Sequence, residues 1–76
     1  MVEAYVMITA AAGTARTVAE TINEQDEVSR AHIIAGEFDV IAEVEAASNQ
    51  ELLSVITEEI QSVENVGHTR TCIVLE

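Results

Sequence analysis

Two histidines and one cysteine are the side chains of this sequence whose types could carry metal or nucleophilic chemistry. Zinc sites use the residue types found at His32, His68 and Glu43, but no metal-binding spacing relates these three. We therefore interpret both histidines as surface or interface residues. Cys72 lies in an apolar run without a basic cluster to activate it, and we expect it to act as a small hydrophobic residue. The sequence therefore predicts no catalytic residue, no metal site and no cofactor.

Paired acids and glycines add no sign of catalysis. Glu43 and Glu45 fall on one strand face, and Glu58 and Glu59 on a helix surface, where solvated charge is the default for such side chains. The three glycines are isolated, so they form no glycine-rich phosphate-binding loop. Nothing in the residue pattern requires an enzyme.

The charge balance excludes several classes of partner. Fourteen acidic residues, three arginines and no lysine give a net charge of −11, which disfavours binding to nucleic acid or to an anionic membrane. An acid-rich composition without lysine is typical of proteins from salt-loving archaea, where salt screens the self-repulsion. We therefore expect a halophilic archaeon as the source. No signal peptide or membrane-spanning run is evident, so we expect a cytoplasmic protein.

The length bounds the architecture. Seventy-six residues make one domain, residues 1–76, and a single cysteine excludes an internal disulfide framework. A domain this small has a thin core, and oligomerisation is a common way to bury more surface.

Hydrophobic periodicity predicts the elements that position these side chains. Helical spacing follows Thr14, a candidate N-cap, and a second helix opens at Ser48, which with Glu51 has the form of a capping box and runs to Asn65. Alternating or continuous apolar runs predict four strands, over residues 2–9, 28–35, 40–46 and 66–75.

The order of elements is an internal repeat of a βαβ unit. A shift of 38 residues superposes apolar positions of the two halves: Val6 on Val44, Val18 on Ile56, Ile22 on Ile60 and Val28 on Val66. This pattern predicts a ferredoxin-like α+β fold, βαββαβ, with a four-stranded antiparallel sheet in the order 4-1-3-2 and two helices on one face. It is the fold type of dimeric α+β barrels.

The sheet face without helices, called the open face below, is predicted to be unusually apolar. It holds Glu3, Tyr5, Met7, Arg30, His32, Ile34, Ile41, Glu43, Glu45, His68, Arg70, Cys72 and Val74. One interpretation is a wet face with scattered apolar residues. The other, which we favour, is a face-to-face homodimer with arginine–glutamate pairs across strands or subunits. Its interface residues would be Tyr5, Met7, Arg30, His32, Ile34, Ile41 and Arg70.

Residues 36–39 join the second and third predicted strands as a hairpin turn. Gly36 supplies the positive φ that tight turns often need, and Asp39 can hydrogen-bond neighbouring backbone. The residue types at this turn therefore have a structural cause before any ligand is considered.

Two segments resemble a known family. Residues 28–40, VSRAHIIAGEFDV, resemble the central signature of the Lrp/AsnC (feast/famine) transcription regulators: a valine strand, Gly-x-aromatic-Asp, then an apolar strand. Residues 66–75, with Thr-x-Thr before aliphatic residues, resemble the last strand of that family's RAM domain, its effector-binding half. The resemblance implies a domain that dimerises through its sheet and assembles into rings such as octamers.

The resemblance also implies an effector site. Small effectors, typically amino acids, would bind at subunit junctions near the turn, with turn amides for a carboxylate and Asp39 for an α-ammonium. Carried over by position, the effector-binding residues are Gly36, Glu37, Phe38, Asp39, Thr69 and Thr71.

The sequence departs from the family in one respect: no helix-turn-helix precedes the first strand. We therefore expect a stand-alone RAM domain that does not bind DNA by itself and acts as a free sensor or with a full-length Lrp-type regulator. The alternative is a small dimeric α+β-barrel enzyme such as a cofactor-free monooxygenase. One Tyr, one Phe and no Trp leave little to line an aromatic substrate pocket.

Overall fold

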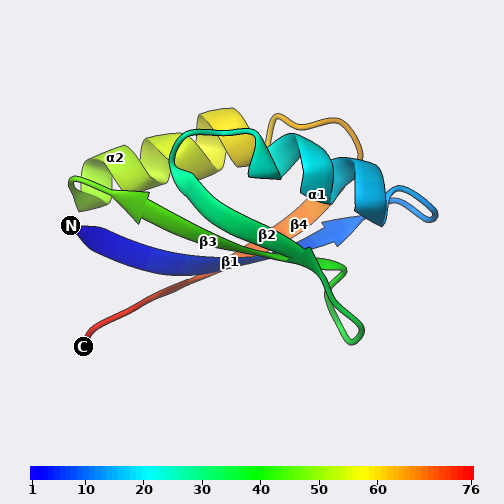
Figure 1. Ribbon diagram of the computed structural model, residues 1–76, viewed down its shortest axis with the longest axis horizontal. Helices are drawn as coiled ribbons and strands as arrows, with labels where there is room; N and C mark the ends of the chain where they lie inside the picture. Colours follow the sequence, from blue (N-terminus) through cyan, green and yellow to red (C-terminus); the bar gives the residue numbers. More distant parts are fainter.

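The computed structural model describes all residues from 1 to 76 and has the predicted βαββαβ order (Figure 1). One helix begins as α-helix and continues as π-helix, so it carries two labels. The elements are β1 (Val2–Ala10), α1 (Ala15–Asn23), β2 (Val28–Ile33), β3 (Val40–Ala46), α2 (Asn49–Ser54), η1 (Val55–Ile60) and β4 (Val66–Ile73). None of these helices has the length and apolar character needed to cross a bilayer.

The four strands form one antiparallel sheet in the order β2-β3-β1-β4, which confirms the predicted order. The helices lie together on one face of the sheet (Figure 1). All 16 buried residues are apolar, and they form one cluster between the helices and the sheet. The repeat accounts for much of this cluster, because seven of its eight paired residues are buried; the eighth, Val66, is half-buried.

The cap of the second helix is as predicted, and the cap of the first is not. The Ser48 hydroxyl accepts a hydrogen bond from the N–H of Glu51 over 3.1 Å. Thr14 occupies the N-cap position of α1, but its hydroxyl donates to the Ala11 carbonyl over 2.6 Å and caps no N–H. Because that carbonyl lies in the preceding turn, Thr14 stabilises the turn instead of the helix.

Two strands are shorter than predicted. β2 ends at Ile33 instead of Ala35, and β4 ends at Ile73 instead of Leu75. Ile34 therefore lies beyond β2, where its N–H donates to the Asp39 carbonyl over 2.9 Å across the neck of the turn. Both are edge strands. β2 ends where β3 begins, whereas β1 continues beside the end of β4, where the Val74 N–H still donates to the Glu3 carbonyl over 2.9 Å.

The strand registers confirm the open face at its centre. Tyr5 lies opposite Cys72 and Met7 opposite Arg70, all four on the open face. The expected pairing of arginine with glutamate across strands is also present, since Arg30 Nε lies 3.2 Å from Glu43 Oε2. Cys72, which was predicted on this face, is a free and exposed cysteine in the single chain. It lies on an edge strand whose open face has no second layer over it.

Candidate functional site

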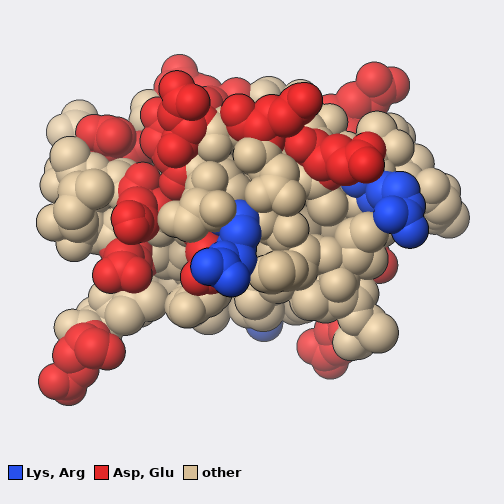
Figure 2. All heavy atoms as spheres, viewed as in Figure 1, with Lys and Arg blue, Asp and Glu red and all other residues tan.

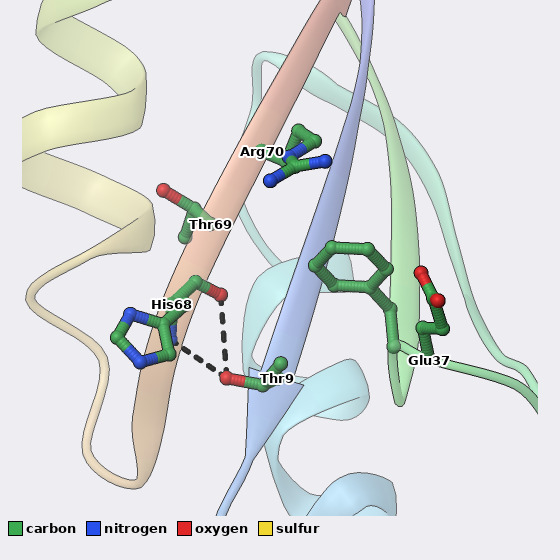
Figure 3. Close-up of a pocket in the computed structure, with 6 residues that line it drawn as sticks. Thr9, Glu37, His68, Thr69 and Arg70 are labelled. Carbon is green, nitrogen blue, oxygen red and sulfur yellow. Dashed lines mark hydrogen bonds between the residues drawn. The ribbon is translucent and has the colours of Figure 1, made fainter.

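A surface pocket of about 410 Å³ lies at one end of the open face, between the β2–β3 turn and β4. Figure 3 shows its labelled side chains, with Thr9 of β1 between Glu37 on one side and the β4 residues on the other. The turn contributes Glu37 and Phe38, β1 contributes Thr9, and β4 contributes His68, Thr69 and Arg70.

The β4 wall of the pocket is shaped by a bulge. Ile8 pairs with Thr69 and Ala10 with Val66, so Gly67 and His68 together lie opposite the single residue Thr9. The Thr9 hydroxyl accepts a hydrogen bond from the N–H of His68 over 2.7 Å and donates a longer one, 3.4 Å, to the His68 carbonyl. At this bulge the Thr9 side chain supplies the hydrogen-bond partner that the interrupted strand pairing does not give to the His68 N–H.

Gly67 is the residue that lets Thr9 approach β4. A Cβ at position 67 would lie 2.6 Å from Thr9 Oγ1, closer than real Cβ contacts allow. The requirement for glycine at this position is therefore steric and comes from the neighbouring strand.

The turn wall is fixed to the same end of β1 through Asp39. Its carboxylate accepts a hydrogen bond from the N–H of Ala10 over 2.8 Å, and its own N–H donates to the Ile8 carbonyl over 2.9 Å. Gly36 has a φ of +152°, in agreement with the predicted need for glycine in this turn. Both observations give the turn residues a structural role.

The two walls carry opposite charge. Arg70 lies on β4, and Glu37 lies on the turn (Figure 3). Arg30 and Glu43 form the only ion pair of the chain, so the guanidinium of Arg70 has no acidic partner within it. An exposed cation and an exposed anion thus face a shared cavity.

The structure divides the six predicted effector-binding residues among different places. Glu37, Phe38 and Thr69 line the pocket, whereas Asp39 is bound to Ala10. Gly36 shapes the turn. Thr71 does not line this pocket and lies on the helix side of the sheet, so its contact with an effector stays a prediction. Strand alternation puts Thr69 and Thr71 on the same side of β4, and only Thr69, which is nearer the turn, also borders the pocket.

Thr9, His68 and Arg70 were not predicted as effector-site residues, although Arg70 was predicted at a dimer interface. His68 and Arg70 alternate with Thr69, which is a sign that they share the open face. No signal in the sequence relates Thr9 to residues 67 and 68, because their contact depends on a bulge between strands distant along the chain.

A second, groove-shaped cavity of about 500 Å³ lies on the helix side, between the second helix and β4. None of its lining residues is charged: Asn49, Leu52, Leu53, Ile56, Thr57, Gln61, Thr69, Thr71 and Ile73. The Gln61 amide donates to the Thr69 hydroxyl over 2.8 Å, which ties the end of the helix to β4. The Thr69 hydroxyl is therefore already engaged on this side.

Acidic side chains crowd the helix layer (Figure 2). Among them, desolvation by partial burial raises the pKa of Glu59 above the ordinary glutamate range, and Glu27, Asp26 and Glu58 raise it further. No group of three or more His, Cys, Asp or Glu side chains is arranged to hold a metal ion. The acids are thus a crowded surface and not a coordination site.

Comparison with known proteins identifies the family. The profile of the Lrp/AsnC ligand-binding domain matches residues 3–76. The chain belongs to this family. It is similar to an uncharacterised HTH-type transcriptional regulator of Pyrococcus furiosus, with 35% identity over 60 residues that make up 79% of this chain and 40% of the relative. The chain therefore spans well under half the length of the curated relatives it matches.

Solved structures of the family share the fold closely. The crystal structure of FFRP-DM1 has a TM-score of 0.93 and 35% identity, covering 99% of this chain and 100% of the other. Escherichia coli AsnC has a TM-score of 0.92 and 25% identity, covering 99% of this chain and 51% of AsnC. Lrp/AsnC proteins are oligomeric regulators that bind small-molecule effectors, and this domain is not an enzyme. The monooxygenase alternative was therefore wrong.

Proposed function

We propose that this Lrp/AsnC domain is an oligomeric regulatory module that binds an amino acid between the β2–β3 turn and β4. The observation that carries the proposal is the pair of opposite charges on the two walls of the pocket, Arg70 on β4 and Glu37 on the turn. An amino acid carries the complementary pair of charges on one carbon.

The charges define an orientation for the effector. The guanidinium of Arg70 binds the α-carboxylate, because guanidinium and carboxylate match as a planar, bidentate pair. Glu37 accepts the α-ammonium, and Phe38 offers an apolar surface to the effector side chain. Asp39, expected to accept the ammonium, is assigned a structural role here because its carboxylate already accepts from Ala10. A cavity of about 410 Å³ is within the range of small-molecule sites.

Calorimetric titration with each of the standard amino acids tests this assignment. We expect at least one to bind, and we expect Arg70→Gln and Glu37→Gln each to weaken its affinity about tenfold or more. Arg16→Gln and Glu20→Gln are matched controls, because they remove the same charges from exposed sites on α1 outside the pocket. The proposal fails if no amino acid binds, or if Arg70→Gln behaves like Arg16→Gln.

We propose further that the open face forms the homodimer. At the centre of this face, Tyr5 is 42% exposed, and Met7 and Ile41 beside it are half-buried. Apolar surface is therefore left uncovered in the single chain. The predicted interface also includes Arg30, His32, Ile34 and Arg70. The pocket lies at the rim of this face, so a second subunit would border the effector.

Light scattering on size-exclusion fractions tests the dimer. Tyr5→Glu is expected to shift the protein toward monomer, whereas Leu53→Glu, an exposed apolar residue on the helix side, is the matched control. A Tyr5→Glu protein with the mass of the wild type contradicts the assignment. Ring assembly such as an octamer, and association with a full-length Lrp-type regulator, are the proposed higher levels; co-purification from the source cell tests the latter.

A further inference from the structure

Both walls of the pocket are attached to the last three residues of β1. Asp39 binds the backbone of Ile8 and Ala10 and so fixes the turn, with N···O distances of 2.9 and 2.8 Å. Thr9, between them, binds the His68 N–H over 2.7 Å and so fixes β4. The end of β1 is therefore the element that sets how far apart the two walls stand.

We propose that Thr9 is a positioning residue of the effector site, holding the β4 bulge in the course that places Arg70 in the pocket it shares with Glu37. This inference rests on the proposed function, since it concerns the same pocket. It assigns to Thr9 a role that does not require contact with the effector's charged groups. The two hydrogen bonds of Asp39 to β1 do not depend on the Thr9 side chain, because their partners are backbone atoms of residues 8 and 10.

The physical reason is the unpaired backbone at the bulge. Without the Thr9 hydroxyl, the His68 N–H has no partner, because opposite Gly67 and His68 the ladder of β1 offers only one residue. The backbone of residues 67 and 68 would then lose the hydrogen bond that ties it to β1 at the bulge, and its exposed N–H would turn to water instead. Arg70 follows two residues later on the same strand, so its guanidinium would move with it.

Replacement by valine and by serine separates the hydroxyl from the shape of the side chain. Valine preserves the branched shape and removes the acceptor, whereas serine keeps the acceptor. We expect Thr9→Val to weaken binding of the tightest of the standard amino acids about tenfold, and Thr9→Ser to stay within about twofold of wild type. Equal affinities for the valine variant and the wild type would overturn the proposal.

A double-mutant cycle with Arg70 distinguishes positioning from general destabilisation. If Thr9 acts through Arg70, then Thr9→Val costs no further affinity in an Arg70→Gln background, so the two changes are not additive. If Thr9 has only a structural role, Thr9→Val weakens binding by the same factor in both backgrounds, and that result would overturn the inference. Thermal melting of each variant reports whether it remains folded.

NMR of the effector-free protein keeps the test independent of the proposed function. In Thr9→Val we expect the amide signals of residues 67–70 to shift and the His68 amide to lose hydrogen-exchange protection, with both restored in Thr9→Ser. Shifts confined to residues 8–10 would overturn the positioning role. If no amino acid binds the wild type, the proposed function fails, while the NMR comparison still decides whether Thr9 holds this wall.

Discussion

The carboxylate of Asp39 accepts a hydrogen bond from the backbone N–H of Ala10 over 2.8 Å, 29 residues back along the chain. The Asp39 N–H donates in turn to the Ile8 carbonyl over 2.9 Å, and its carbonyl accepts from the Ile34 N–H. One residue thus joins the turn, the end of β2 and the end of β1. The fold therefore explains why an aspartate stands at position 39 before any effector is invoked.

Asp39→Ala is expected to destabilise the fold by about 1–2 kcal/mol, because it leaves the part-buried Ala10 N–H without its partner. Asp39→Asn should recover much of that stability, because the amide oxygen can still accept the same hydrogen bond. Urea denaturation measures both. If Asp39 instead bound the ammonium of an effector, Asp39→Asn would be as poor as Asp39→Ala in amino-acid titrations.

Gly67→Ala is expected to cost about 1–3 kcal/mol, because its Cβ would lie 2.6 Å from Thr9 Oγ1. The cost should largely vanish in a Thr9→Ala background, where the next nearest atom to the added Cβ is the carbonyl oxygen of residue 9 at 3.6 Å. Denaturation of Gly67→Ala, Thr9→Ala and the double variant gives the free energies of unfolding that this comparison needs. Additive losses would show that the close approach is not what requires glycine.

Glu59 gives the stability a defined dependence on pH. Partial burial, Glu27, Asp26 and Glu58 raise the pKa of Glu59 in the folded state, so the folded protein binds this proton more tightly than the unfolded chain does. Stability from this group is therefore present at low pH and is lost as pH rises through the window that begins at the ordinary glutamate pKa and ends at the raised one.

Glu59→Gln should accordingly raise the melting temperature at about pH 7.5 and change it little near pH 4. Glu20→Gln, an exposed position on α1, is the control for loss of one surface charge. Melting curves of both variants at several pH values provide the measurement. A benefit of Glu59→Gln that is the same at every pH, or no larger than that of Glu20→Gln, would contradict the assignment.

The net charge of −11 predicts that salt stabilises this protein. Raising KCl from about 0.1 M to about 1 M shortens the Debye length from about 10 Å to about 3 Å, which screens repulsion among the dispersed acids. We expect the melting temperature to rise across that range, and to rise less in a sucrose series that adds no ions. A melting temperature that is flat or falls with KCl would argue against adaptation to high salt.

The sequence predicted the architecture well because the matching positions of its repeat are apolar residues, which become buried in the core. Val6, Val18 and Ile22, with their counterparts 38 residues later, lie in the core, and their spacing alone implied both helices and the sheet order. The turn was predicted from Gly36 and Asp39 for the same kind of reason, a local backbone requirement. Such signals act over a few residues and can be read in order along the chain.

The site was predicted only in part. Glu37, Phe38 and Thr69, named from family resemblance, line the pocket and Thr71 does not, while Thr9 was missed because its contact with β4 depends on a bulge that no local pattern signals. The partner of Asp39 could not be predicted either, since Ala10 is recognised by its backbone and any residue could supply that N–H.

By itself, the sequence determined the fold, the strand order, the surface charge and the family, because these follow from periodicity, composition and local motifs. The tertiary structure alone decided that Asp39 braces β1, that Thr9 requires Gly67, and that Arg70 and Glu37 face one cavity. Each of these depends on a register or a bulge between strands distant in sequence. A shift of one residue in that pairing would send the same side chains to the opposite face of the sheet.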